Sequence, residues 1–291
     1  MSQYAYGGQA VIEGVMMRGG QNMAVAVRRA SGEIVEHCEK VVSLTERWRI
    51  LNLPFIRGFI LLVESLIMGV QTLAYSANQV VEEVGETISP WEMALSVMFA
   101  LGAGIILFFL IPVWLAHFLT PYLPSPLYQN LGEGFLRMLI FLLYVLIISL
   151  LPDIQRVFAY HGAEHKVIHA YEAGEVLVVE NVRKYSTLHP RCGTSFLLFV
   201  MLISIVVFSL CGDLSLAMRL LSRVLLLPVI AGISYEFLKF TGKYQKVWLI
   251  SWLSIPGLWL QKLTTRQPDD QQLEVALYAL KKVMASQAGD Q

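Results

Sequence analysis

One short stretch of the sequence places three histidines and two glutamates at helical spacing. His161 and His165 are four residues apart with Glu164 between them, and His169 and Glu172 follow along the same stretch. On an α-helix this spacing brings all five side chains toward one face. The order H-x-x-E-H is that of the inverzincin metallopeptidases, in which two imidazoles bind zinc and the carboxylate activates water. The stretch therefore predicts a divalent metal site, with zinc as the expected ion, His161 and His165 as ligands and Glu164 as the catalytic base.

A catalytic zinc site also needs a third protein ligand and an open position for water. The candidates are His189, Cys192 and Glu236. His189 and Cys192 have H-x-x-C spacing, which lets both reach one ion, and a thiol where a helix begins favours the thiolate. Glu236 lies in an apolar segment, where an ionisable group is a functional hypothesis by default. All three stay open, and His169 or Glu172 could fix the tautomer of a ligating imidazole.

Two further charged residues accompany the candidate site. Glu13 lies in a β-prone run from Ala10 to Val15 that glycines frame, and alternation along one strand would put it on an apolar face. A carboxylate there needs a partner or an edge position, and we expect Arg18 to be the partner. Arg191, next to Cys192, is a further candidate site residue, or lies at lipid headgroups where the chain enters the membrane.

The same residues also allow interpretations without metal. The histidine stripe could be a hydrogen-bonded or pH-sensitive face, with His165 and Glu172 paired across turns. Cys192 could be a small buried apolar side chain. Glu236 could form an ion pair with Lys239 or Lys243, which follow it closely.

The composition predicts a membrane protein. Of the 291 residues, 56% are hydrophobic and only 15% are charged, whereas soluble domains average about 25% charged residues. Long uncharged runs predict a membrane all-α bundle whose partner is the lipid bilayer. The formal net charge of zero argues against a role in binding polyanions, so we expect no nucleic-acid partner. About four spans are expected, at residues 94–116, 135–151, 194–211 and 220–240.

The basic residues predict the orientation of these spans. The loops at 117–134 and 212–218 contain no Lys or Arg. By the positive-inside rule both termini and the 152–193 loop are therefore cytoplasmic. Arg137 lies one turn inside its span, and we expect its side chain to extend outward to the interface.

The chain divides into four parts by pattern. The first is a small β-rich cytoplasmic unit, and the second is an amphipathic helical segment at the membrane surface or packed on the bundle. The third is the transmembrane bundle with the cytoplasmic 152–193 loop, ending in a Trp-rich stretch at 247–260 that is broken at Pro256 and suits the interface or a re-entrant turn. The last is a cytoplasmic amphipathic helix. These parts cover residues 1–53, 54–90, 91–262 and 263–291.

Four blocks of the sequence resemble the signature blocks of the bacterial YqhQ family of uncharacterised integral membrane proteins. They are GGQAVIEGVMMRG at 7–19, YHGAEHK at 160–166, HPRCGTSF at 189–196 and SYE at 234–236. The resemblance extends over residues 4–262. It implies a bacterial inner-membrane location and, because these proteins are sometimes described as predicted metal-dependent enzymes, a metal site.

Three functions agree with these features. The first is metal-dependent hydrolysis of a membrane-proximal substrate such as a peptide or lipid headgroup. The second is a non-enzymatic membrane scaffold or accessory subunit of protein-insertion or envelope machinery, which would have a membrane protein as its partner. The third is a transporter, which Glu236 and the Pro228 and Gly232 in its span favour but the lack of internal repeats disfavours.

Overall fold

A four-stranded antiparallel sheet forms the N-terminal part of the chain in the computed structural model, which describes residues 6–82, 88–244 and 247–289. Residues 83–87 of the predicted 54–90 segment lie outside the described residues. The strands pair in sequence order, which confirms the predicted β-rich unit. They are β1 (Tyr6–Val11), β2 (Gly14–Gly19), β3 (Asn22–Arg28) and β4 (Ile34–Lys40).

Helices make up most of the remaining described chain. A π-helical turn (Ile106–Leu110) joins α3 to α4, and 3-10 turns follow α1 and α4 (Arg49–Asn52 and Thr120–Tyr122). The helices are α1 (Leu44–Arg47), α2 (Ile56–Glu82), α3 (Pro90–Ile105), α4 (Ile111–Leu119), α5 (Pro126–Ile148), α6 (Pro152–Glu172), α7 (Val179–Val182), α8 (Gly193–Ser209), α9 (Leu216–Leu225), α10 (Leu227–Lys243), α11 (Trp248–Thr264) and α12 (Asp270–Gly289).

The predicted single strand around Glu13 is wrong. Val11 pairs with Gly14, so Ile12 and Glu13 form a two-residue turn between β1 and β2. Glu13 has a φ of 51°, in the left-handed region that is rare for residues other than glycine. Because a turn interrupts the alternation, the Glu13 side chain projects from the end of the hairpin instead of from a strand face.

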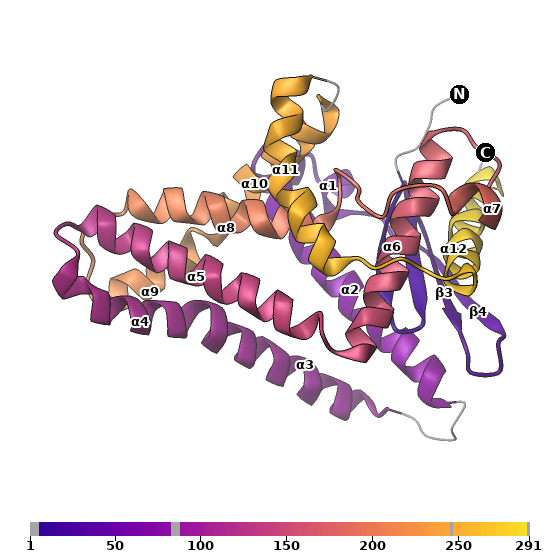
Figure 1. Ribbon diagram of the computed structural model, residues 1–291, viewed down its shortest axis with the longest axis horizontal. Coiled ribbons are helices and arrows are strands. Elements are labelled where there is room, and N and C mark those ends of the chain that lie inside the picture. The colour runs from indigo at the N-terminus through magenta and orange to yellow at the C-terminus, as the bar shows by residue number, and fades with distance from the viewer. Residues whose placement is uncertain (1–5, 83–87, 245–246, 290–291) are drawn as a thin grey trace.

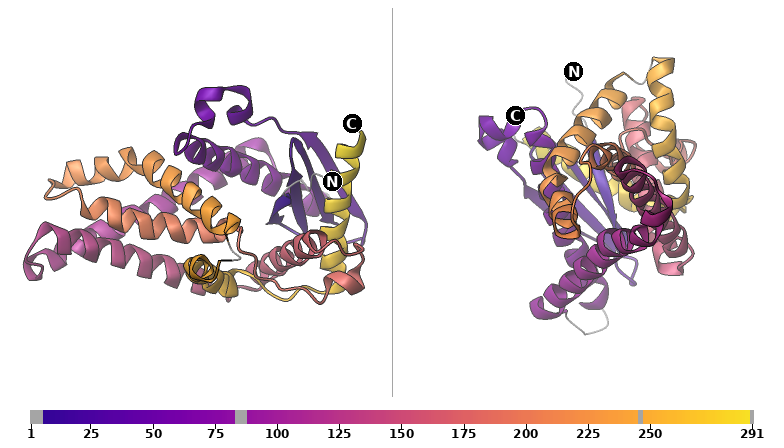
Figure 2. Two further views of the ribbon diagram at one scale, coloured as in Figure 1. Left: turned by 90° about the horizontal axis from the view of Figure 1, so that it is seen from above. Right: turned by 90° about the vertical axis from the view of Figure 1, so that its left-hand side faces the viewer.

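Both faces of the sheet are covered by helices, α12 and α6 on one side and α2 on the other (Figure 2). Alternation along β3 assigns its side chains to these two faces. Ala24 and Ala26 point to the α12 side, and their small size lets that helix approach closely. Met23, Val25 and Val27 point to the α2 side.

The C-terminal helix α12 buries its apolar stripe on the sheet. The members of the stripe recur at helical spacing, and all are at most 4% exposed: Leu273, Ala276, Leu277, Leu280 and Val283. Asp269 precedes the helix, and its carboxylate accepts a hydrogen bond from the Gln272 amide at 2.8 Å. The first and last elements of the chain therefore share one core.

Helices α3, α4, α5 and α8 extend away from this body in one direction (Figure 1). Three helical stretches are long and apolar enough to cross a membrane: Ile56–Val81, Pro90–Tyr122 and Pro126–Ile148. A fourth is α9 with α10, if that pair, bent by 41°, counts as one span. Pro228 at the start of α10 accounts for the bend, because proline cannot donate the hydrogen bond that would continue the helix. The predicted third span corresponds to α8, which has only 17 residues.

Helices α2 and α11 do not adopt the positions or shapes that their sequences suggest. α2 is long and apolar, yet its C-terminal half lies on the sheet through Met68, Tyr75 and Val80, while its N-terminal half packs on α10. The expected break in the Trp-rich stretch is wrong, because α11 continues as one helix through Pro256. Its three tryptophans are exposed, at 71%, 64% and 65% for Trp248, Trp252 and Trp259.

The expectation that Arg137 extends to the interface is also wrong. The side chain is buried, and its Nη2 donates to Glu133 Oε1 at 2.7 Å. Arg223 also binds Glu133, so one carboxylate satisfies two guanidinium groups. Because Arg137 is paired with a buried carboxylate, its side chain does not extend to the lipid headgroups.

Candidate metal centre

Helix α6 carries the histidine stretch along the side of the sheet. Its central residues are buried between β1, α12 and the segment that connects α7 to α8. Gly162 makes this packing close, because a Cβ at that position would overlap the Arg266 carbonyl oxygen. The stretch is therefore enclosed by protein and is not a solvated helix face.

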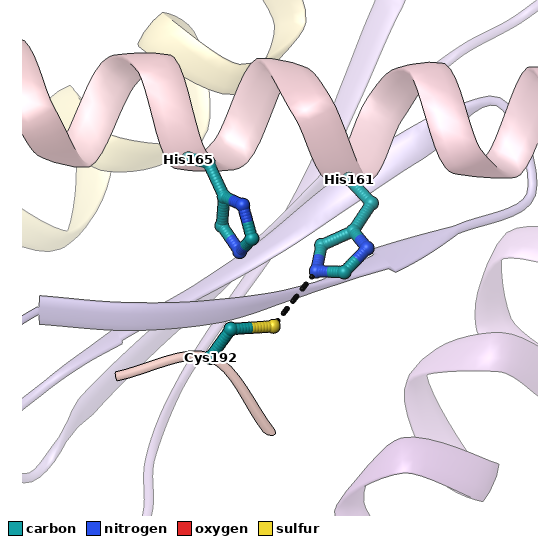
Figure 3. Close-up of side chains that lie close together, drawn as sticks. All are labelled: His161, His165 and Cys192. Carbon is teal, nitrogen blue, oxygen red and sulfur yellow. Dashed lines mark hydrogen bonds between the residues drawn. The ribbon is translucent and has the colours of Figure 1, made fainter. Parts of the chain in front are cut away.

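The structure brings His161, His165 and Cys192 together. One ligand atom from each lies within 4.8 Å of the others. The His161 and His165 rings have centroids 4.4 Å apart, and His161 Nε2 lies 3.2 Å from Cys192 Sγ. Figure 3 shows both imidazoles projecting from α6 toward the sulfur atom. Ligand atoms around a tetrahedral zinc ion lie about 3.5 Å apart, so this group is close to the required dimensions.

Backbone carbonyls hold both imidazoles from behind. His161 Nδ1 lies 2.8 Å from the Thr264 carbonyl oxygen, and His165 Nδ1 lies 2.5 Å from that of Thr187. Because a carbonyl only accepts, each Nδ1 carries the proton and each Nε2 presents a lone pair to the space beside Cys192. Metal-binding histidines have this outer support, which fixes the tautomer and the ring orientation.

A second group lies one helical turn further along α6. His169, Glu172 and His189 also place ligand atoms within 4.8 Å of one another. His169 Nε2 donates to the Leu188 carbonyl at 2.9 Å. Glu172 forms an ion pair with Arg191, so its negative charge is already compensated. His189 Nε2 is buried without a hydrogen bond, 3.5 Å from a Glu172 oxygen.

The turn that carries His189 and Cys192 is fixed by Gln261. The Gln261 side chain accepts from the His189 amide at 2.7 Å and donates to the His189 carbonyl at 2.8 Å and to Ser195 Oγ at 2.9 Å. Cys192 then precedes α8, where its sulfur accepts from the Thr194 amide at 3.4 Å. α11 therefore positions the third member of the first group.

Burial favours the neutral form of three of the histidines. It lowers the pKa of His165, His169 and His189 below the ordinary imidazole value. For His165, hydrogen bonding to Cys192 acts in the opposite direction, and for His189 the nearby Glu164 does so. A neutral imidazole is the form that binds metal, so these residues are in the competent state at neutral pH.

Glu164 lies outside both groups of ligand atoms. Its side chain is 5% exposed and lies against β1, where a Cβ on Gly8 would come within 3.1 Å of the carboxyl carbon. Burial raises the pKa of this carboxyl, while His161, His189 and the Gly8 amide act to lower it. The Glu164 carboxylate thus interacts with the charges of His161 and His189 but forms no hydrogen bond with either imidazole. Its catalytic role stays a prediction.

The structure does not bring Glu236 to the histidines. Both of its carboxylate oxygens accept from Arg57 at 2.6 Å, which joins α10 to α2. In the interpretation without metal, Glu236 was expected to form an ion pair with Lys239 or Lys243. Glu236 does form an ion pair, but its partner is Arg57.

The expected pairing of Glu13 with Arg18 is wrong. The two oxygens of Glu13 accept from Arg156 at 2.6 Å, and Tyr160 donates to one of them at 3.2 Å. Arg18 donates instead to the carbonyl oxygens of Gly20 and Val41. Glu13 therefore links the β1–β2 turn to the start of α6 and does not belong to either ligand group.

Sequence reasoning missed the residues that support the site. Thr187 and Thr264 act through backbone carbonyls, which every residue type has, and Gln261 acts from 72 positions beyond His189. Arg156 was detectable only as a basic residue one helical turn before Tyr160.

Comparisons with known proteins place this chain in a family. The model of the family described as "Protein of unknown function (DUF1385)" matches residues 53–286. The chain belongs to this family. It is 36% identical over 303 aligned positions to "Uncharacterized protein YqhQ" of Bacillus subtilis (strain 168), with 98% of this chain and 93% of that protein covered. No solved structure matches the chain. The resemblance to the YqhQ family is thereby confirmed.

Proposed function

We propose that this protein is a multi-pass protein of the bacterial cytoplasmic membrane with a zinc site formed by His161, His165 and Cys192 at its cytoplasmic side. The observation that carries the proposal is the pair of carbonyls behind the imidazoles, which leaves both Nε2 lone pairs directed at one sulfur atom. Two nitrogens and one sulfur form a donor set that zinc favours.

We assign the role of a catalytic centre to this site. Among the described residues, the group contains three protein ligands, which leaves a fourth tetrahedral position for a substrate or water. Bound zinc would supply Lewis-acid activation of water. Glu164, which precedes His165 on α6, lies against β1 and, unlike Glu172, forms no ion pair with an arginine in the described chain. We assign it the role of holding a proton. We assign hydrolysis of a membrane-proximal peptide or lipid headgroup to this arrangement.

The membrane location rests on the apolar helices and on the distribution of basic residues. Three helices, or four with the bent pair, have the required length and hydropathy. The basic residues gather at the side that also holds the sheet, α6 and α12, which the positive-inside rule assigns to the cytoplasm.

A scaffold or accessory subunit is the second candidate, and Cys192 provides the observation that favours it. Its sulfur caps α8 by accepting from the Thr194 amide, so its position has a structural explanation without metal. In that case the buried imidazoles would serve packing alone, and the exposed tryptophans of α11 would face a membrane-protein partner.

Metal content separates the two candidates. We expect detergent-purified protein to contain about one zinc ion per chain by elemental mass spectrometry. A His161→Ala/His165→Ala double variant should contain almost none, whereas a His37→Ala variant, altered at an exposed position on β4, should match the wild type. Equal zinc in the double variant and the wild type would reject the site.

Hydrolysis is tested with Glu164. A Glu164→Gln variant should keep its zinc and lose turnover of native membrane lipids or peptides. Mass spectrometry of the reaction products measures this turnover. Unchanged turnover in this variant would reject the catalytic assignment. A zinc-loaded protein without any turnover would favour the scaffold.

A further inference from the structure

A cavity of about 510 Å³ lies at the end of the bundle that is remote from the sheet. It is bordered by α4, α5 and α9 and by the loop that precedes α9 (Figure 1). The lining residues are mostly apolar, with a few polar groups at one side: Leu110, Val113, Trp114, His117, Thr120, Gln129, Asp213, Leu214, Arg219 and Leu220. None of these residues belongs to the candidate metal centre.

Arg219 is the notable polar group in this lining. Its side chain is half-buried, and its Nε is buried without a hydrogen-bond partner. A buried donor of this kind is costly unless an acceptor binds it. The cavity lining therefore contains an unpaired N–H group of a cationic side chain, which an acceptor on an anionic ligand would satisfy.

The wall beside Arg219 is held rigidly by a buried ionic network. Arg223, one turn further along α9, donates to Glu133 at 2.9 and 3.0 Å and to Asn130 at 3.2 Å. Asn130 also donates to the Gly212 carbonyl at 3.1 Å, which fixes the loop before α9. This network joins α5, α9 and the loop, so the cavity is preformed on that side.

The opposite wall contains the π-helical turn between α3 and α4. Arg137 Nε donates to the Phe108 carbonyl within that turn at 3.0 Å. π-Helical turns occur frequently at functional sites because they redirect side chains and free a carbonyl. Leu110, the last residue of the turn, lines the cavity and is 44% exposed, and Trp114 beyond it is 61% exposed. The cavity is thus open between side chains that face the lipid in a membrane.

We propose that this cavity binds one phospholipid, with the phosphate on Arg219 and an acyl chain along the apolar lining. A free phosphate ion would bind the guanidinium but leave the apolar side chains of Val113, Leu214 and Leu220 uncovered. A phospholipid would bind the guanidinium through its phosphate and cover the apolar side chains with an acyl chain. The Asp213 carboxylate on the same lining favours a headgroup that pairs its phosphate with an ammonium group, as in phosphatidylethanolamine. This inference rests on the proposed membrane location and is independent of the metal site.

Native mass spectrometry of delipidated protein tests the proposal. Titrated phosphatidylethanolamine should give a 1:1 complex, and Arg219→Gln should weaken that complex about tenfold, since a charge-assisted hydrogen bond is lost. Arg47→Gln, altered at an exposed position on α1, is the matched control and should bind as the wild type does. Equal binding by Arg219→Gln and wild type would overturn the proposal.

Two further measurements distinguish the source of the phosphate and the role of the cavity. Inorganic phosphate at millimolar concentration should leave the lipid bound, and displacement by phosphate alone would overturn the choice of a lipid. Leu220→Trp should fill the cavity and abolish the complex while the thermal transition is retained. A Leu220→Trp variant that still binds the lipid would place the ligand elsewhere and overturn the proposal. The two sites share no residue, so zinc content should not change in any of these variants, and a failure here is separate from a failure of the metal site.

Discussion

One side chain, Gln261, binds both the amide and the carbonyl of His189, at 2.7 and 2.8 Å. The contact is fully buried, since Gln261 is 0% exposed and His189 is 4% exposed. It ties the turn carrying the candidate ligands to α11. Because the turn has no regular secondary structure of its own, its shape depends on this contact.

Replacing Gln261 should loosen the turn. Gln261→Met keeps the volume but leaves the buried His189 amide unpaired, at about 1–3 kcal/mol, and removes one of the two hydrogen bonds to the His189 carbonyl, so we expect a loss of about 2 kcal/mol of stability. Thermal unfolding followed by intrinsic tryptophan fluorescence measures the loss, and zinc content should fall with it. Gln271→Met, at an exposed position, is the control. A wild-type transition temperature in Gln261→Met would show that the turn is held by other contacts.

Acid should destabilise the metal-free protein through His189. Burial lowers the pKa of this imidazole in the folded state, so the unfolded chain binds more protons below about pH 6.5. The stabilising effect of the neutral ring is therefore complete above that pH and is lost as the pH falls. We expect His189→Gln to show a smaller fall in transition temperature than wild type between about pH 7.5 and 5.5. If the transition temperatures of the two proteins fell equally with pH, His189 would not be the cause of the acid destabilisation.

The buried network around Glu133 should be required for stability. Glu133→Gln removes the one carboxylate that pairs with both Arg137 and Arg223. Breaking a buried ion pair from one side typically costs about 3–5 kcal/mol, because the remaining charge is uncompensated. Thermal unfolding in detergent measures the effect, with Glu180→Gln, an exposed position on α7, as the control. Equal stability of the two variants would mean that water reaches the network.

Packing of α12 on the sheet gives a fourth prediction. Leu280 is 0% exposed in the shared core, and truncating a buried leucine to alanine typically costs about 3 kcal/mol. Leu280→Ala should therefore lower the transition temperature and increase proteolysis of the sheet. Lys281→Ala, the adjacent exposed position, should do neither. Resistance of Leu280→Ala to protease equal to that of wild type would indicate that the sheet does not depend on α12.

The sequence predicted those features that depend on local periodicity. His161 and His165 could be paired from their spacing, whereas Cys192 was one of three possible third ligands, with His189 and Glu236. The stripe on α12 followed from the same 3.6-residue period. In each case the residues that matter are close in the chain and of distinctive type.

What the sequence could not predict depends on contacts between distant segments. Glu13 pairs with Arg156 across 143 positions and Glu236 with Arg57 across 179, and any of several basic residues would have fitted equally well. Glu133 was overlooked because the orientation rule counts only Lys and Arg. The two carbonyls behind the imidazoles have no signature in the side-chain sequence.

The sharing of one core by β2, β3 and α12 has a consequence for biosynthesis. The sheet is synthesised before the apolar helices, and α12, which covers one of its faces together with α6, is synthesised after them. The nascent sheet therefore keeps part of this apolar face uncovered until α12 has been synthesised.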